Sequence, residues 1–213
     1  MARWSRANPL ALAVLVCLYE KPMHPYEVAQ TLRQRAKHES VRLNYGSLYA
    51  VVDSLEKRGF VKATGTLREG KRPERTVYQI TEEGSREMNE WMTELIGVPA
   101  KEYPAFMAGL SFLPSLPPDE ALMALKSRAD ALKVKLAGMR GAMKAAQEGG
   151  LPRLFELEAE YEEQQVAAEL KFVSGLVHEL NDETLDGFEM WRMFHTEGFD
   201  PKEVEFNFDL PAE

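Results

Sequence analysis

The feature that most constrains the fold of this chain is an apolar stripe with a heptad period in its second half. Between residues 122 and 143, leucine, alanine and methionine recur at alternating spacings of three and four. This spacing is typical of a long helix with one buried seam. A second stripe covers residues 166–180, and Gly149 and Gly150 separate the two. The sequence therefore predicts two long helices that lie antiparallel.

Both seams need a cover, and little other sequence in this half can supply it. Two-fold pairing of two chains would bury the seams most simply, so a homodimer is expected. An intramolecular helical hairpin packed on the first domain is the alternative. The residues expected in the dimer interface are Leu122, Leu125, Leu132, Leu136, Met139, Val166, Leu170, Val173 and Val177.

The first third of the chain begins with an apolar run at residues 10–19. Asn8 and Pro9 precede it, and these residue types favour a helix start. The run is too short to span a bilayer, and no small-residue cleavage site follows it. We therefore interpret it as a buried core helix, not as a signal peptide or membrane anchor.

Shorter elements follow in a recognisable order. Further helices are expected from Pro25 and over residues 45–58. Two β-rich segments, 60–64 and 76–81, flank a basic turn that contains glycine and proline, which predicts a hairpin. A fourth helix is expected after Gly84. Three helices, a hairpin and one more helix are the order of a winged helix.

These expectations combine into a mainly α fold with a small β-hairpin wing. A winged helix-turn-helix domain is expected at residues 1–98 and a linker with a short apolar helix at 99–118. An antiparallel long-helix dimerisation domain is expected at 119–198, and residues 199–213 form a tail.

Charge is distributed unevenly along the chain. Residues 1–80 carry a net charge of +7 and the remainder carries −15, which together give the net charge of −8 for the whole chain. A basic first third joined to an acidic remainder predicts a polyanion-binding module attached to a partner-binding one.

The helix over residues 45–58 has the two faces that a DNA-reading helix needs. Leu48, Val52 and Leu55 form an apolar stripe, which leaves Ser47 on the outside. Gly46 allows a close backbone approach, and a helix amino terminus favours phosphate. In helix-turn-helix proteins, the first residues of the second helix reach base edges.

The turn of the hairpin adds positive charge. Lys71, Arg72 and Arg75 suit phosphate or minor-groove contacts, and the alternative is a solvated basic hairpin. Lys57 and Arg58 end the preceding helix, where a favourable interaction with the helix dipole is a second explanation for them.

Three motifs follow one another along the first half of the chain: Gly46-Ser-Leu-Tyr49, Leu55-Glu-Lys-Arg-Gly59 and Tyr78-Gln-Ile-Thr-Glu-Glu-Gly84. In this order and spacing, they resemble the PadR family of winged-helix transcriptional regulators. The long helical second half is similar in architecture to the larger-subunit branch. The chain departs from the family at Ala50, where proline is common, and at Pro25, where a small residue is usual.

The resemblance implies a DNA-binding regulator, usually a repressor, that a small apolar or aromatic effector releases from double-stranded DNA. It also implies roles for Ser47 and Tyr49 at bases or phosphates, and for Tyr26 and Tyr78 at phosphates. Core packing is an equal alternative for Tyr78. Residues and resemblance together predict a DNA interface of Tyr26, Gly46, Ser47, Tyr49, Lys57, Arg58, Lys71, Arg72, Arg75 and Tyr78. Trp4, Trp91 and Trp191 are candidates for an effector pocket, and ordinary core packing is the alternative for them.

The sequence argues against other classes of protein. Four scattered histidines and one cysteine, Cys17, build no metal or catalytic site, so neither a cofactor nor enzymatic activity is expected. The carboxylates between Glu156 and Glu163 are interpreted as a solvated helix face. A single cysteine fits a reducing, cytoplasmic compartment. Two rival functions remain: a winged-helix adaptor that binds proteins without specific DNA binding, and an architectural DNA-binding protein without an effector.

Overall fold

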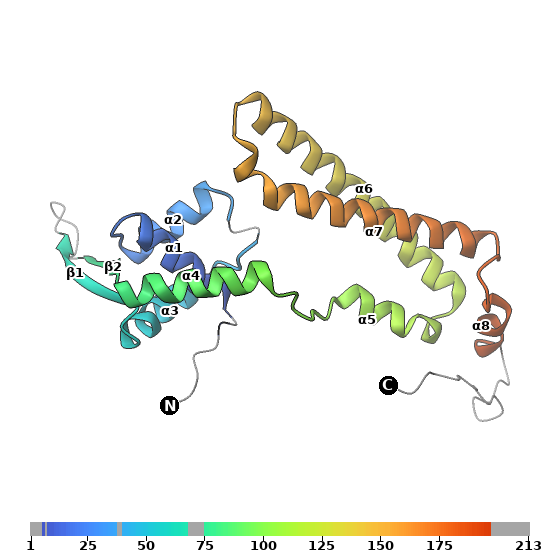
Figure 1. The fold of residues 1–213 in the computed structure, drawn as a ribbon. Helices are drawn as coiled ribbons and strands as arrows, with labels where there is room; N and C mark the ends of the chain where they lie inside the picture. Colours follow the sequence, from blue (N-terminus) through green and yellow to red (C-terminus); the bar gives the residue numbers. More distant parts are fainter. Residues whose placement is uncertain (1–5, 7, 38–39, 68–74, 197–213) are drawn as a thin grey trace. The chain divides into compact units, whose positions relative to one another are not determined.

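The computed structural model describes residues 6, 8–37, 40–67 and 75–196 (Figure 1). The chain forms two compact units, residues 1–102 and 103–213, and each unit has its own apolar core. The described part of the chain is mainly helical with one two-stranded antiparallel sheet. This confirms the predicted fold class.

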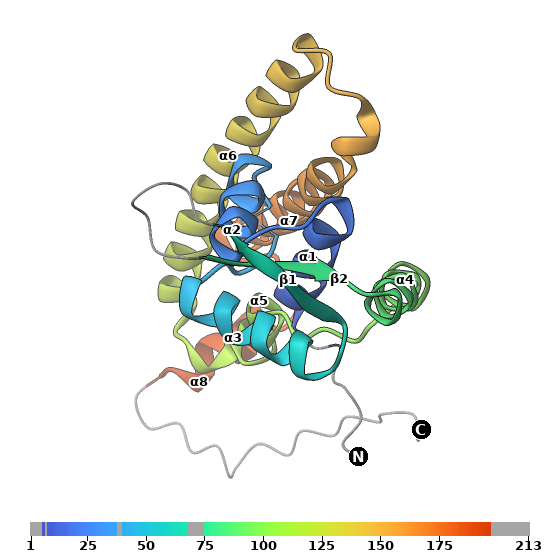
Figure 2. The ribbon, with the colours of Figure 1, turned by 90° about the vertical axis from the view of Figure 1, so that its left-hand side faces the viewer.

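The described residues of unit 1 form four helices and a hairpin. These elements are α1 (Pro9–Glu20), α2 (Pro25–Gln34), α3 (Tyr45–Lys57), β1 (Val61–Leu67), β2 (Arg75–Ile80) and α4 (Glu82–Gly97). Helix α1 is the centre of the core, because it contacts α2, α3, α4 and β2. Its run of apolar residues is therefore covered on nearly every side, as predicted for a core helix. In Figure 2 the hairpin faces the viewer, with α3 below it and α4 to the right.

Local signals set the start of α1 and the state of its cysteine. The Asn8 side chain accepts a hydrogen bond from the backbone N–H of Leu10, over 3.1 Å, and so caps the helix. The Cys17 thiol is buried, and this burial raises its pKa to about 11. A protonated thiol in an apolar core acts as a small hydrophobic side chain.

The hairpin is joined to the helices at two places. Met23, between α1 and α2, forms a two-way backbone bridge with Tyr78 on β2, with both hydrogen bonds 3.0 Å long. At the other end, the Thr81 hydroxyl accepts from the backbone N–H of Gly84 and so caps α4. A Cβ on Gly84 would lie 2.0 Å from the carbonyl oxygen of Phe60, so only glycine fits there. The Thr81-Glu-Glu-Gly84 motif therefore holds α4 against the hairpin.

Unit 2 contains a long helical pair with shorter helices at one end. Its elements are α5 (Ala105–Ser111), the 3-10 helix η1 (Leu113–Ser115), α6 (Pro118–Glu148), the 3-10 helix η2 (Arg153–Phe155), α7 (Leu157–Asn181) and α8 (Phe188–Phe194). Helices α6 and α7 lie side by side along their length (Figure 1). Glycine at 149 and 150 and Pro152 separate them, at the break that the sequence predicted.

The heptad stripes pack against each other within one chain. Leu125, Leu132, Leu136, Val166 and Val173 are buried in the core between α6 and α7. The other residues expected at the dimer interface, Leu122, Met139, Leu170 and Val177, are half-buried against the same core. A short turn lets each helix cover much of the seam of the other, and the role of these residues at a dimer interface stays a prediction.

Charged side chains reinforce this pairing from outside. Arg128 Nε donates to Glu169 over 2.6 Å, and Lys135 pairs with Glu162 over 2.7 Å. One expectation was wrong: Glu156, assigned to the solvated face, is only 4% exposed and accepts a hydrogen bond from Gln147 over 3.2 Å. Glu156 directly precedes α7, at the turn, where the acidic pattern of the helix face does not apply.

Among the helices of the described ranges, none combines the length and hydropathy that crossing a membrane requires. Within the same residues, no group of three or more histidine, cysteine or acidic side chains is arranged to hold a metal ion.

Candidate nucleic-acid interface

The amino-terminal turn of α3 presents a group of exposed side chains. The Asn44 side chain caps the helix by accepting from the backbone N–H of Gly46 over 2.9 Å. Apolar residues on the inner face, including Val51, which the predicted stripe omitted, are buried in the core of unit 1. Gly46, Ser47 and Tyr49 are exposed, and Tyr49 is 44% exposed. This turn is accessible to a ligand, while the opposite face of the helix is fixed by packing in the core.

The start of α2 lies beside this turn. The Tyr26 ring stacks on the Tyr45 ring, with centroids 6.3 Å apart. His24 caps α2 by accepting from the backbone N–H of Tyr26 at Nδ1, over 3.1 Å. The His24 ring also meets the Tyr49 ring edge-on, with centroids 6.2 Å apart. Tyr26 and Tyr49, both predicted DNA contacts, therefore belong to one aromatic surface made by α2 and α3.

Strand β2 contributes to the same surface. The guanidinium of Arg75 lies 5.8 Å from the centroid of the Tyr26 ring. A hollow of about 180 Å³ lies where α2, α3 and β2 meet. Its lining residues are His24, Pro25, Tyr49, Val52, Asp53, Arg75, Thr76 and Tyr78. The structure thus brings together Tyr26, Tyr49, Arg75 and Tyr78 from three separate elements.

Burial sets the protonation states of two groups in this hollow. The pKa of His24 is lowered, first by desolvation and then by the nearby Arg75, although Glu27 opposes the shift. The neutral imidazole is also the form that can accept the helix-capping hydrogen bond at Nδ1. Desolvation raises the pKa of Tyr78, and the carboxylates of Glu56 and Asp53 raise it further. Tyr78 therefore keeps its phenolic proton and remains a hydrogen-bond donor.

The remaining predicted contacts lie elsewhere. Lys57 and Arg58 are exposed at the carboxyl end of α3, a 13-residue helix. Such a helix is about 20 Å long, so these residues are well separated from Gly46 and Ser47. Lys71 and Arg72, in the turn of the wing, lie outside the described residues.

The two described tryptophans lie in different apolar cores. Trp91 is 1% exposed in the core of unit 1, and Trp191 is 5% exposed in the core of unit 2. Trp191 also donates through Nε1 to the carbonyl of Leu116 over 2.8 Å. Trp4 lies outside the described residues. Core packing accounts for the two described tryptophans, and their role at an effector pocket stays a prediction.

Sequence reasoning missed two exposed residues at this surface, Arg33 and Tyr45. Arg33 Nη1 donates to the Tyr45 hydroxyl over 2.6 Å, and its guanidinium carbon lies 4.6 Å from the centroid of the Tyr45 ring. The tyrosine at the first position of the predicted helix was a signal that could have been used. Its proximity to Tyr26 could not be seen, because the angle between the two helices depends on the connection between them.

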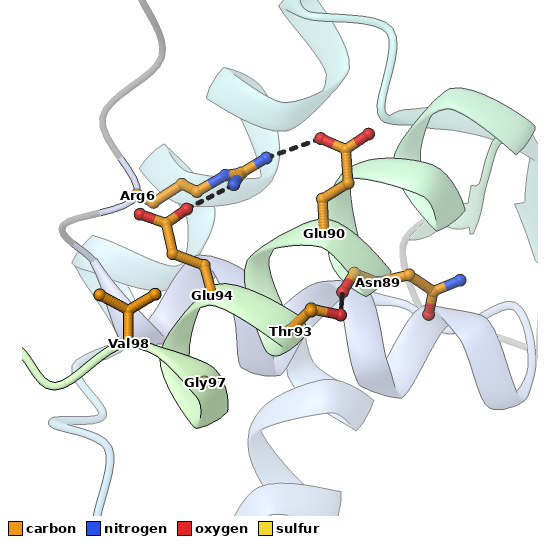
Figure 3. Close-up of a pocket in the computed structure, with 7 residues that line it drawn as sticks. All are labelled: Arg6, Asn89, Glu90, Thr93, Glu94, Gly97 and Val98. Carbon is orange, nitrogen blue, oxygen red and sulfur yellow. Dashed lines mark hydrogen bonds and ion pairs between the residues drawn. The ribbon is translucent and has the colours of Figure 1, made fainter.

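A second hollow in unit 1 has the opposite electrostatic character. It is wide, with a volume of about 620 Å³, and lies along α4 (Figure 3). Arg6 Nη1 contacts Glu94 over 2.6 Å and Arg6 Nη2 contacts Glu90 over 3.0 Å (Figure 3). Arg6 also pairs with Glu87 over 2.8 Å, and these hydrogen bonds raise its pKa. Carboxylates outnumber the one arginine here, so this hollow does not suit a polyanion.

A helical core, an exposed third helix and an antiparallel hairpin define unit 1 as a winged-helix domain. Residues 14–90 match the model of the transcriptional regulator PadR-like family. Unit 1 therefore carries a PadR-like domain, as the motifs predicted. The family that this model describes consists of transcriptional regulators and not of enzymes.

Solved structures show the same fold. Bacillus subtilis PadR in complex with operator DNA has a TM-score of 0.65 at 17% identity, and the match covers 81% of this chain and 99% of that one. Bacillus subtilis PadR in complex with p-coumaric acid has a TM-score of 0.65 at 16% identity, with 81% and 98% covered. The Vibrio cholerae virulence activator AphA has a TM-score of 0.63 at 16% identity, with 82% and 99% covered. No curated protein sequence gives a significant match.

Proposed function

We propose that the chain regulates transcription by binding a specific double-stranded DNA sequence through α3. The observation that carries this proposal is the exposed amino-terminal turn of α3, next to Tyr26 and Arg75 on one surface of a winged helix. Bacillus subtilis PadR, which shares the fold, has been solved with operator DNA.

Different parts of the surface have different tasks in this proposal. Ser47 and Tyr49 occupy the turn that reaches base edges in helix-turn-helix proteins, so they select sequence. Tyr26, Tyr78 and Arg75 bind phosphates, which fixes the position of α3 on the duplex. Lys57, Arg58, Lys71 and Arg72 add backbone contacts on either side. The net charge of +7 over residues 1–80 draws this unit toward DNA.

The proposed regulator is a cytoplasmic homodimer that pairs through unit 2, with residues 119–198 as the dimerisation domain. Much of the heptad stripe is covered within the chain, so in this proposal its half-buried residues Leu122, Met139, Leu170 and Val177 are joined at the interface by apolar side chains that stay exposed. Large ones on the long helices and their turn are Met123, Val134, Leu154, Phe155, Tyr161 and Phe172. Exposed apolar surface of this kind is typical of protein–protein interfaces.

The regulator is a repressor in this proposal, and a small apolar or aromatic effector releases it from DNA. Bacillus subtilis PadR has been solved with p-coumaric acid, a small aromatic compound. Effector binding would rotate the two winged helices relative to the dimer and change the spacing of the two α3 helices. Titration with aromatic acids during DNA binding tests this step: release at saturating compound supports it, and unchanged binding to every compound contradicts it.

The role of Ser47 in recognising the DNA sequence is tested by comparing Ser47→Ala with Ser127→Ala. The control makes the same change at an exposed site of α6. The binding of each variant to a duplex from upstream of the protein's own coding sequence and to a shuffled duplex is measured. Ser47→Ala should reduce the preference for the upstream duplex several-fold, because a base contact is lost. Ser127→Ala should leave this preference unchanged. Equal preferences in both variants would remove Ser47 from the base-reading surface.

A further inference from the structure

Four side chains from three elements form a row of stacked contacts on the surface of unit 1. The rings of Tyr26 and Tyr45 stack with their planes 14° from parallel. Arg33 lies over the Tyr45 ring and Arg75 lies over the Tyr26 ring. Helix α2 supplies Tyr26 and Arg33, α3 supplies Tyr45 and β2 supplies Arg75. We call these four residues the arginine–tyrosine row.

The row holds its arginines in place without neutralising them. The hydroxyl of Tyr45 accepts a hydrogen bond from Arg33, which leaves the guanidinium fully charged. In the described part of the chain, no carboxylate is paired with Arg33 or Arg75. Arg35, two residues further on, differs because Glu20 neutralises it through hydrogen bonds of 2.5 and 2.7 Å. Positive charge is therefore kept selectively in the row.

The row is also accessible. Tyr26 and Tyr45 are 40% and 36% exposed, Arg33 is exposed and Arg75 is half-buried. A ring that stacks on a guanidinium occupies one face of it and leaves N–H groups at its edge for an anion. Because stacking already restricts the side chains, less conformational freedom is lost when an anion binds. The row thus presents preorganised donors from all three elements that form the proposed DNA surface.

We propose that the arginine–tyrosine row binds phosphates of the DNA backbone, with Arg33 as a direct contact and Tyr45 as the residue that positions it. This inference rests on the proposed DNA-binding function and adds two residues to its surface. Phosphate geometry suits the planar guanidinium, which can donate two parallel hydrogen bonds. Because every sequence carries the same phosphates, the row contributes affinity and register, and leaves sequence choice to the start of α3.

The test measures the affinity of the full chain for the upstream duplex and the shuffled duplex over a range of salt concentrations. Arg33→Ala should weaken binding to both duplexes by the same factor, about tenfold for a charged hydrogen bond. The slope of log affinity against log salt should fall by about one per bound subunit. The matched control is Arg35→Ala, which removes the same charge from the residue that follows α2 and should change affinity less than about twofold.

Variants of Tyr45 separate positioning from direct contact. Tyr45→Phe keeps the stack and loses the hydroxyl, so a loss of about two- to threefold is expected. Tyr45→Ala should approach the loss seen with Arg33→Ala, and combining the two should add little, because both changes remove the same contact. Arg33→Lys keeps the charge without the planar stack, and its affinity should fall between those of the wild type and Arg33→Ala.

The outcomes distinguish this inference from the proposed function. If the wild type prefers the upstream duplex but Arg33→Ala and Arg35→Ala have equal effects, the row is not a phosphate contact and the proposed function stands. If the wild type binds neither duplex, both proposals fail. Thermal unfolding shows whether an alanine variant has misfolded. If one has, the test uses Arg33→Lys and Tyr45→Phe, which nearly conserve side-chain volume. Wild-type affinity for DNA in both of these variants would overturn the inference.

Discussion

The two units of this chain bury their apolar side chains in opposite ways. Unit 1 packs short helices and a hairpin around α1, so the central helix is covered on nearly every side. Unit 2 buries one seam between two long helices and leaves Met123, Val134 and Phe172 between 54% and 75% exposed. Unit 1 also leaves Leu95 and Ile96 exposed near the end of α4, 53% and 82%, so the units differ in how the core is built rather than in whether apolar side chains stay exposed.

Charge follows the same division. Unit 1, residues 1–102, carries a net charge of +3, of which residues 1–80 contribute +7, and unit 2, residues 103–213, carries −11. An acidic second unit repels DNA, so it confines attraction to the winged helix and reduces non-specific contact along its own length. This difference supports the proposed function, in which unit 1 meets a polyanion and unit 2 meets a second protein surface.

The largest loss of folding stability is expected from a substitution that disrupts the core of unit 1. Gly84→Ala places a Cβ 2.0 Å from the carbonyl oxygen of Phe60, so the hairpin and α4 must move apart. We expect a loss of about 4 kcal/mol or more in the free energy of unfolding, measured by urea denaturation. Gly97→Ala, later on the same helix and with nothing within 4 Å of its Cβ, is the control and should be nearly neutral. Equal stability of the two variants would contradict this packing.

A second pair of changes separates the inner seam of unit 2 from its exposed apolar face. Leu125, 4% exposed, lies in the seam, and Met123, 65% exposed, lies outside it. Leu125→Ala should cost about 2–4 kcal/mol of folding stability. Met123→Ala should leave the folding stability of the single chain within about 0.5 kcal/mol of the wild type and should weaken dimer association instead. Denaturation with far-ultraviolet circular dichroism measures both stabilities, and a costly Met123→Ala with a neutral Leu125→Ala would reverse the assignment of faces.

A smaller effect concerns pH and unit 1. The pKa of His24 lies below its ordinary value of 6.5 in the folded chain, so the unfolded chain binds a proton first as pH falls. The contribution of His24 to folding stability is therefore fully present above pH 6.5, and it is lost as the pH falls toward the pKa of His24 in the folded chain. Asparagine is also a good helix cap, so His24→Asn should keep α2 and remove this part of the pH dependence. Melting curves between neutral and mildly acidic pH test this, and an unchanged pH dependence in His24→Asn would exclude His24 as its source.

The smallest expected effect concerns the contacts between Arg6 and α4. Arg6→Ala leaves Glu87, Glu90 and Glu94 together without their shared cation. These groups are partly exposed, so a loss of at most about 1 kcal/mol is expected, and salt should diminish it. Denaturation at low and high salt measures the loss. Arg86→Ala, which breaks an exposed pair with Glu83, is the control and should cost less.

Much of the fold could be predicted because its signals are local. The Asn8-Pro9 start of α1, the hairpin and the inner face of α3 follow from capping residues, turn residues and periodicity. The partner of the heptad stripe could not be predicted, because periodicity shows that a face is buried but not whether the covering helix belongs to the same chain. The stack of Tyr26 on Tyr45 was missed for a similar reason, since it depends on the angle between two helices.

The central claim is that unit 1 binds DNA and that the chain does so as a dimer. Its most direct test is a titration of the wild-type chain with the upstream and shuffled duplexes at increasing salt, with the mass of each complex measured by light scattering. We predict a complex of one dimer per duplex, a preference for the upstream duplex, and an affinity that falls steeply as salt rises. A folded protein that binds neither duplex, even at low salt, would contradict the claim and favour a winged-helix adaptor that binds proteins.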